Sequence, residues 1–359
     1  MLTDNLLLKK QVMNMGINRL IAKGLEEPLI PTRTYMATSL FREGDVPFYI
    51  PLGRKIQDYR RLYLNTEIIN NIVPFYFDGI KFNMIICPPG KYVKMIWKDS
   101  YKTEIIEKEI NIENPFLLSE TKVTQELYQA VMGYNPSYYN GSRRTTFPTN
   151  SVIDFGTNLK RPVERLSWFE AIFFCNELSV SLGLDQISTI KLGEIEIKDP
   201  NEITSGKSGS YYTTSFSTNT IGISLPTIEH LEYVFTHTLE HDLSDINNKA
   251  WLNTTGKELD NNHPTQAVAQ KKPDSWGFYD LIGNGKDFCR PKSEPKWGGA
   301  FVEGFGLDYK EDVSDELKKL APDYPLRSQE TDLLISKLPT NGAPKNTTGF
   351  RIMLEYVRV

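Results

Sequence analysis

Hydrophobic residues recur at helical spacing in four segments of the chain. In two of them a hydroxyl side chain that suits an N-cap, Thr124 or Ser167, precedes the apolar positions, and a glycine, Gly133 or Gly183, follows them. Apolar residues three and four positions apart share one face of a helix, so each segment has a face to bury. The predicted helices cover residues 5–24, 124–133, 167–183 and 226–235.

Shorter apolar runs bounded by turn residues predict strands. Residues 82–92 indicate a buried strand followed by a turn, residues 105–112 show the alternation of a second strand, and residues 351–357 predict a closing strand. Residues 185–222 are polar and rich in Ser, Thr and Gly, which indicates a long insertion with short hairpins. Between residue 240 and the closing strand few regular signals are visible.

Residues 26–75 have a different character, because five prolines interrupt them and tyrosines lie in between. Proline is excluded from helix interiors and from central strands. The segment is therefore expected to be extended and irregular, and to lie along another surface, of its own domain or of a neighbouring chain. We predict an N-terminal helix and extended arm over residues 1–79 and a folded domain over residues 80–359.

Composition narrows the classes of function. Hydrophobic residues make up 40% of the 359 residues, which is enough for a sizeable core. The net charge of −4 gives no uniform basic field, so no nucleic-acid partner is expected. No apolar run is long enough to predict a membrane span, and the N-terminus lacks the features of a signal peptide, so synthesis in the cytoplasm is expected. The three cysteines form no CxxC pair and are expected to be small buried residues.

Seven short blocks give a more specific pattern. They are ETKVTQ (120–125), VMGYNPS (131–137), RPVERLSW (161–168), LPTIEHLEY (225–233), WGFYDLIGN (276–284), GG (298–299) and GFR (349–351). In this order they resemble the formylglycine-generating enzymes, or sulfatase-modifying factors, over about residues 80–359. The resemblance implies an α+β fold of the C-type-lectin-like kind, with a loop-rich, twisted antiparallel sheet and two to three helices. Arg351 is then expected to donate to buried carbonyls, because its guanidinium offers five donors.

The positions that match the copper site of the family are changed. In formylglycine-generating enzymes a Gly-Gly turn is followed by two cysteines that bind copper and carry out the oxidation. The matching positions here hold Glu303 and Asp308. A carboxylate is a hard oxygen donor, which cannot replace a thiolate as a ligand of Cu(I) or in thiol exchange. The resemblance therefore favours a scaffold without the family's chemistry, and leaves open whether the chain is an enzyme.

A second departure concerns a loop that binds calcium in related proteins. The family's Gly-Asn-Val-Trp-Glu-Trp is replaced by GNGKDF at residues 283–288. Asn284 and Asp287 keep oxygen donors of the kind that calcium needs, whereas Lys286 brings a competing positive charge. No cofactor is expected; calcium at Asn284 and Asp287 stays open, and a metal-free, hydrogen-bonded loop is the favoured interpretation.

Aromatic and acidic residues gather where the family has its active site. Two interpretations stay open: most of them are core residues of a loop-built domain, or some line the contact with a ligand or a partner, where aromatic residues dominate. The candidate contact residues are Trp297, Phe301, Glu303, Phe305, Asp308 and Tyr309.

The favoured hypothesis is a non-catalytic binding or structural module that is a subunit of a larger assembly. A surface, decoration or receptor-facing protein of a phage virion is the most concrete form of it. Protein partners or further copies of the chain would be contacted through the N-terminal arm, and a cell-surface ligand is a further partner to consider. The alternatives are a metal-dependent oxidase with a changed site and an intracellular bacterial sensor module.

Overall fold

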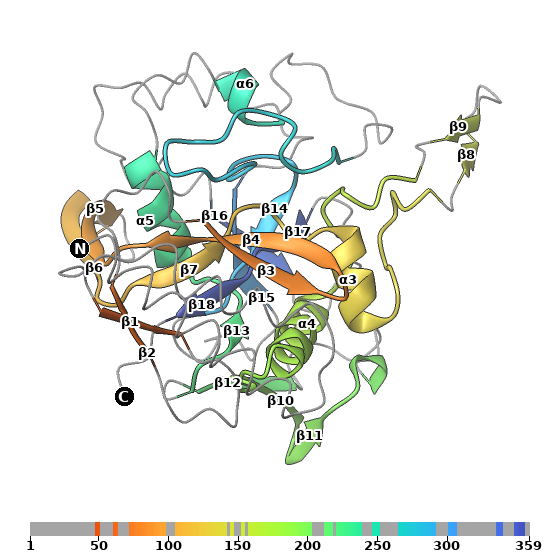
Figure 1. Ribbon diagram of the computed structural model, residues 1–359, viewed down its shortest axis with the longest axis horizontal. Helices are drawn as coiled ribbons and strands as arrows, with labels where there is room; N and C mark the ends of the chain where they lie inside the picture. Colours follow the sequence, from red (N-terminus) through yellow and green to blue (C-terminus); the bar gives the residue numbers. More distant parts are fainter. Residues whose placement is uncertain are drawn as a thin grey trace, which may run out of the picture.

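A five-stranded sheet lies at the centre of the fold (Figure 1). The computed structural model describes residues 47–50, 60–63, 72–97, 105–141, 144–146, 152–154, 157–202, 212–217, 220–238, 246–251, 265–291, 301–306, 335–339 and 348–355. The sheet has the strand order β13-β18-β7-β4-β3, and all neighbouring strands in it are antiparallel. Its strands are β3 (Ile72–Phe77), β4 (Ile80–Cys87), β7 (Phe116–Ser119), β13 (Ile223–Ser224) and β18 (Met353–Glu355).

Three helices form where the sequence predicts them, and two of them begin at the predicted N-caps. The Thr124 hydroxyl accepts a hydrogen bond from the backbone N–H of Leu127 at 3.3 Å, and Ser167 forms a reciprocal capping box with Glu170. Gly133 ends its helix with a φ of 79°, a left-handed conformation that favours glycine. The three predictions between residues 124 and 235 are thereby confirmed. The helices are α3 (Gln125–Met132), α4 (Trp168–Ser181) and α5 (Ile228–Thr238).

Both faces of the central sheet are buried. Along β4, Met84 and Ile86 belong to one hydrophobic cluster, whereas Ile85 and Cys87 belong to a second cluster on the opposite face. Helices α3 and α4 contribute to the first cluster and α5 contributes to the second, so helices cover the sheet from both sides (Figure 1). A strand that is covered on both faces has apolar residues at consecutive positions, and this pattern in the sequence predicted β4.

A second sheet of four strands carries the segment that resembles the family's active site. Its order is β16-β15-β14-β17, in which only the β14–β17 pair is parallel. The sequence shows few regular signals here, because these strands are short and their partners lie far away along the chain. The strands are β14 (Lys286–Phe288), β15 (Phe301–Phe305), β16 (Ile335–Pro339) and β17 (Thr348–Gly349).

Smaller elements complete the described part of the chain. The predicted hairpins of residues 185–222 are present as a three-stranded sheet with the order β11-β10-β12. The strand predicted over residues 105–112 is confirmed as β6, which pairs with β5. The elements are β5 (Gly90–Trp97), β6 (Ile105–Ile112), β8 (Arg144–Thr146), β9 (Val152–Asp154), β10 (Ser188–Leu192), β11 (Ile195–Ile197), η2 (Pro200–Glu202), β12 (Tyr212–Phe216) and α6 (Ile246–Lys249).

The arm predicted to be irregular contains strands. Pro74 lies within β3, opposite Asn83 of β4. β3 is an edge strand with a neighbouring strand on one side only, so proline, which has no backbone N–H, is tolerated there. The boundary predicted at residue 80 falls at the turn between β3 and β4, so residues 72–79 belong to the central hairpin and not to the arm. Two further strands, β1 (Pro47–Ile50) and β2 (Arg60–Tyr63), pair with each other. The helix predicted over residues 5–24 lies outside the described residues.

The described elements form the α+β fold that the resemblance implies, with three longer helices packed on antiparallel sheets. Long connections join the elements, as expected for a C-type-lectin-like domain. Of the helices that the structure describes, none has the length and apolar character that a bilayer crossing requires.

Candidate functional site

A cluster of buried polar side chains joins the central sheet to the second sheet. Its five members are each at most 2% exposed. Asp287 comes from β14, Lys122 from the segment between β7 and α3, and Arg351 from the segment between β17 and β18. Asp280 and Asn284 come from the loop that precedes β14. Three separate parts of the chain therefore meet at one point in the interior.

An ion triad forms the centre of this cluster. The Lys122 Nζ donates to Asp287 Oδ2 at 2.6 Å, and the Arg351 Nε donates to the same oxygen at 3.2 Å. All three side chains are fully buried. A buried carboxylate is tolerated only when it is paired and hydrogen-bonded, and here two cations share one oxygen. The second oxygen, Oδ1, has no hydrogen-bond partner among the described residues.

Arg351 also binds the backbone around it. Its Nη1 donates to the carbonyls of Ser119 at 3.1 Å and of Glu120 at 3.0 Å, and its Nη2 donates to the carbonyl of Tyr279. These bonds tie the end of β7 to the loop before β14. The prediction that Arg351 satisfies buried carbonyls is confirmed.

Burial controls the protonation of the cluster. Burial lowers the pKa of Lys122, and the nearby Asp287 carboxylate opposes this shift. Burial raises the pKa of Asp280, which the positive charges of Arg351 and Lys122 oppose. The cluster thus balances two acidic side chains against two basic ones, and each charge is supported by the opposite charges beside it.

Asn284 is held by backbone groups. Its Oδ1 accepts from the backbone N–H of Gln266 at 2.9 Å, and its Nδ2 donates to the Gln266 carbonyl at 3.0 Å. The residue has a φ of 54°, in the left-handed region that asparagine adopts more readily than most residues. Both polar ends of the amide are therefore used to fix the loop.

The calcium site considered for Asn284 and Asp287 does not fit these contacts. A calcium ion needs six to eight oxygen ligands, whereas the Asn284 oxygen is bonded to Gln266 and the bonded Asp287 oxygen faces two cations. Among the residues that the structure describes, no three His, Cys, Asp or Glu side chains gather in a metal-binding arrangement. The sequence analysis assigned the competing positive charge to Lys286. In the structure the lysine that pairs with Asp287 is Lys122.

The candidate contact residues fall into two groups. Phe305 is fully buried, and its ring lies 6.0 Å from that of Phe235 on α5 in an edge-to-face arrangement, so it is a core residue and not the contact residue considered for it. Phe301 and Glu303 lie on β15, opposite Pro339 and Lys337 of β16. The other candidates, Trp297, Asp308 and Tyr309, lie outside the described residues.

The three cysteines of the chain are buried, form no disulfide, and lie in separate parts of the fold. Cys87 ends β4, Cys175 lies within α4, and Cys289 follows β14. Burial raises the pKa of the Cys87 and Cys175 thiols above their usual range. All three therefore have the role of small core residues that the sequence predicts.

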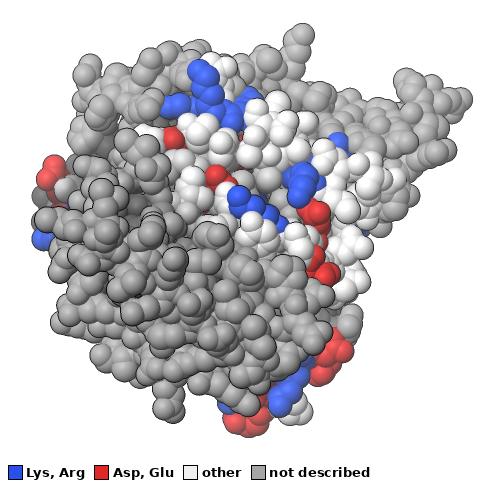
Figure 2. All heavy atoms as spheres, viewed as in Figure 1, with Lys and Arg blue, Asp and Glu red and all other residues white. Residues whose placement is uncertain are grey.

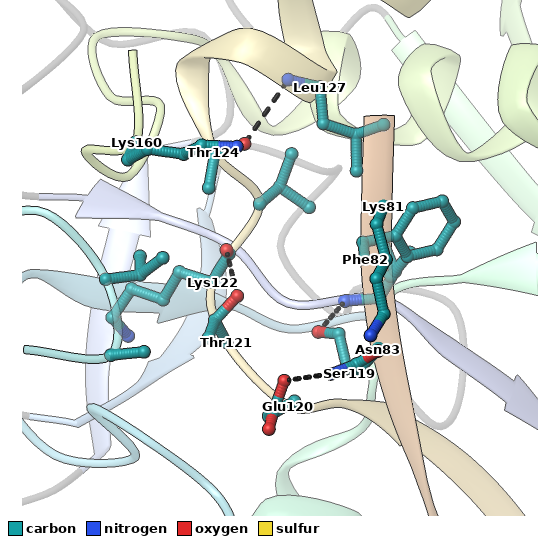
Figure 3. A pocket seen from close by; sticks show the side chains of 14 residues that line it. Lys81, Phe82, Asn83, Ser119, Glu120, Thr121, Lys122, Thr124, Leu127 and Lys160 are labelled. Atoms are coloured by element: carbon teal, nitrogen blue, oxygen red, sulfur yellow. Dashed lines mark hydrogen bonds between the residues drawn. The ribbon is translucent and has the colours of Figure 1, made fainter. Parts of the chain in front are cut away.

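A recess on the surface was missed by the sequence analysis. It lies between β4 and the start of α3 and is drawn in Figure 3. The block at residues 120–125 marked the family but not a recess, because the rest of the wall comes from distant parts of the chain. The lining residues are 81–83, 119–124, 127, 160, 268–269 and 352. Figure 2 shows Lys or Arg side chains next to Asp or Glu side chains on the face that it draws, the mixed distribution expected from the small net charge.

Replacing Lys122 by Met tests the ion triad. The change leaves Asp287 buried with one cation fewer, so we expect the free energy of unfolding to fall by about 3 kcal/mol. Chemical denaturation measures the loss. Lys91→Met is the matched control, because Lys91 forms a pair of similar length with Glu109, 2.7 Å, but both side chains are more than half exposed. The control should cost less than about 1 kcal/mol. Equal losses in the two variants would contradict a central role of the triad.

Calcium and chelator titrations test the metal-free loop. Because Asp287 and Asn284 are already bonded to protein groups, we expect the same thermal unfolding midpoint in excess calcium and in EDTA. A ligand that binds only the folded state raises the midpoint. A midpoint that rises with calcium concentration, and that Asp287→Asn makes insensitive to calcium, would restore the calcium site.

Comparison with known proteins agrees with this architecture. Residues 81–320 match the family described as the sulfatase-modifying factor enzyme 1-like domain. The chaperone protein LppX of Paenibacillus barcinonensis is 26% identical over 207 residues, which cover 52% of this chain and 66% of LppX. Similar solved structures include Treponema denticola variable protein 1, with a TM-score of 0.57 and 23% identity over 78% of this chain and 98% of that one. CarF has a TM-score of 0.50 and 20% identity over 76% of this chain and 98% of CarF.

The two structural similarities lie below 25% identity and therefore show the fold alone. The family match is of a different kind, because it covers two thirds of the chain and includes the blocks from ETKVTQ to the Gly-Gly turn. The chain belongs to the family of sulfatase-modifying factor enzyme 1-like domains.

Proposed function

We propose that this chain is a non-catalytic binding or structural module and a subunit of a larger assembly, such as a surface, decoration or receptor-facing protein of a phage virion. In this proposal it is made in the cytoplasm and incorporated into the assembly. It contacts protein partners, or further copies of itself, through the residues that precede the family domain. The proposal has two parts, the absence of the family's oxidation chemistry and the presence of an assembly contact.

The burial of the three cysteines supports the absence of the family's oxidation chemistry. Copper-dependent oxidation of a thiol needs accessible thiolates that bind Cu(I). Cys87, Cys175 and Cys289 are the only cysteines of the chain, and each is at most 1% exposed. Two of them belong to one hydrophobic cluster and the third to the other. No pair of them is available at the surface for the two-cysteine chemistry.

The donors at the matching positions support the same conclusion. Glu303 lies in the interior strand β15 of the second sheet, and Asp308 follows that strand in the sequence. Carboxylates prefer hard cations and do not form the soft, two-coordinate site that Cu(I) takes with thiolates. The donor set at these positions therefore does not fit copper in the way that a pair of cysteines does.

Two observations support the presence of an assembly contact: the different roles of similar proteins and the position at which the family match begins. The similar proteins bear the names of a sulfatase-modifying enzyme, a chaperone and a variable protein, so one domain serves different purposes in different proteins. The family match begins at residue 81, and β3 pairs with β4 in the central sheet, so residues 1–71 are the addition to the domain. The four prolines between residues 26 and 71 favour an extended segment that lies along a neighbouring surface.

A thiol-oxidation assay tests the first part. The purified chain is loaded with copper, freed of excess metal and incubated with a thiol-containing peptide under air. We expect no stoichiometric copper by elemental analysis and no oxygen consumption above that of the buffer. A Glu303→Cys, Asp308→Cys double variant is the matched control, because two thiolates at these positions should give the chain Cu(I) binding. Turnover by the unmodified chain, abolished by Glu303→Gln, would establish the metal-dependent oxidase instead.

Hydrogen exchange tests the assembly contact. Exchange of the amides in residues 1–71 is compared between the isolated chain and the chain purified within its native particle or complex. We expect stronger protection in the assembly, because a partner surface removes amides from water. The amides of β4, buried in both states, serve as the internal control. Identical protection in both samples, or failure to recover the chain in any complex, would contradict the proposed assembly contact.

A further inference from the structure

The recess of Figure 3 has the properties of a small binding site. It has a volume of about 220 Å³ and lies between strand β4, the segment that follows β7, and residues 268–269. Pockets for drug-sized ligands are larger, about 300–1,000 Å³. The recess is therefore suited to one small ring or a group of similar size.

Two polar side chains of the recess, Lys81 and Glu120, have hydrogen-bonding capacity that the described residues do not use. Lys81 and Asn83 are two positions apart on β4 and therefore share a face of the strand. The Asn83 Nδ2 donates to Glu120 Oε2 at 2.7 Å, which leaves the Glu120 Oε1 without a partner among the described residues. Asn83 Oδ1 is too deeply buried to reach a ligand, so Asn83 positions the Glu120 carboxylate. Lys81 is exposed and forms no ion pair with any residue that the structure describes.

Another part of the wall, at Ala269, is held in a strained conformation. Ala269 lines the recess with a φ of 57°, which is uncommon for a residue that has a Cβ. Its N–H donates to Asp280 Oδ2 at 3.3 Å, and the N–H of Val268 donates to the carbonyl of Lys160 at 2.9 Å. Backbone strain of this kind costs free energy, and it is found most often at ligand sites and active sites. The buried polar cluster thus shapes this wall through Asp280.

The unused groups define the chemistry of a ligand. The free carboxylate oxygen of Glu120 needs a donor, whereas the Lys81 ammonium needs an acceptor. Two neighbouring hydroxyls supply both, one donating to Glu120 and the other accepting from Lys81. An anion such as phosphate is disfavoured, because Glu120 would repel it and the second nearby ammonium, that of Lys160, is already paired with Glu126.

We propose that this recess binds a single sugar residue of a glycan through neighbouring hydroxyl groups, with Glu120 accepting a hydrogen bond and Lys81 donating one. The proposal rests on the proposed function, because it names the class of ligand for a binding module. It places the ligand away from β15, the strand that carries Glu303.

Binding of simple glycosides tests the site. The full chain is titrated with the methyl glycosides of glucose, galactose, mannose and N-acetylglucosamine, and binding is measured by ligand-observed NMR and calorimetry. We expect saturable binding of at least one of them. Glu120→Gln should weaken it about tenfold or more, because hydrogen bonds to a charged group are the stronger ones. Lys81→Met should weaken it by a smaller factor, about threefold to tenfold, because this lysine is exposed.

Lys91→Met is the control, since it removes an exposed lysine on β5, a strand that does not line the recess. It should bind as the unmodified chain does, and thermal unfolding should show that all three variants are folded. The proposal is overturned if no glycoside binds, or if both recess variants bind normally. Tighter binding of glycine, a zwitterion that offers an ammonium and a carboxylate to the same groups, would also overturn it. These outcomes are independent of thiol oxidation, so failure of the sugar site and failure of the non-catalytic assignment can be told apart.

Discussion

The buried pairing of Lys122 and Arg351 with Asp287 is the contact on which the rest of the described structure depends. A carboxylate in the interior is very unfavourable unless opposite charges and hydrogen-bond donors surround it. To provide them, the segment after β7, the segment between β17 and β18, and strand β14 must converge within hydrogen-bonding distance. The central sheet and the second sheet are thereby fixed to each other, and Arg351 extends the connection to three backbone carbonyls.

The Lys122–Asp287–Arg351 contact also bears on the function that we propose. The side chains of Asn284, in the loop before β14, and of Asp287, in β14, are buried and bonded to the chain itself, so they hold the domain together. The three cysteines of the chain are buried in the two hydrophobic clusters. In the described part of the chain a surface recess is accessible, and its wall at Ala269 is anchored by Asp280 of the polar cluster. The proposed binding role follows from this division between a closed interior and an open recess.

Local signals were sufficient for much of the fold. The caps at Thr124 and Ser167 and the continuous apolar run of β4 each predicted an element that the structure contains, because they act over a few residues. The ordered blocks identified the family, and with it the α+β class. The strands of the second sheet and the edge strand β3 were missed, because short strands become visible only through partners that are distant in the sequence. Pro74 shows this directly, since only the place of β3 at the edge makes proline acceptable there.

The polar cluster could not be read from the sequence for a related reason. Asp287 and Asn284 offer oxygen atoms that could bind either a calcium ion or an ammonium group. The ammonium group that binds Asp287 belongs to Lys122, which is 165 residues away in the sequence. A double-mutant cycle of Lys122→Met and Asp287→Leu measures this interaction most directly. Our account predicts that the double variant loses less stability than the sum of the two single variants, by about 1–3 kcal/mol, because removing both partners leaves one fewer unpaired buried charge. Losses that simply add would contradict it.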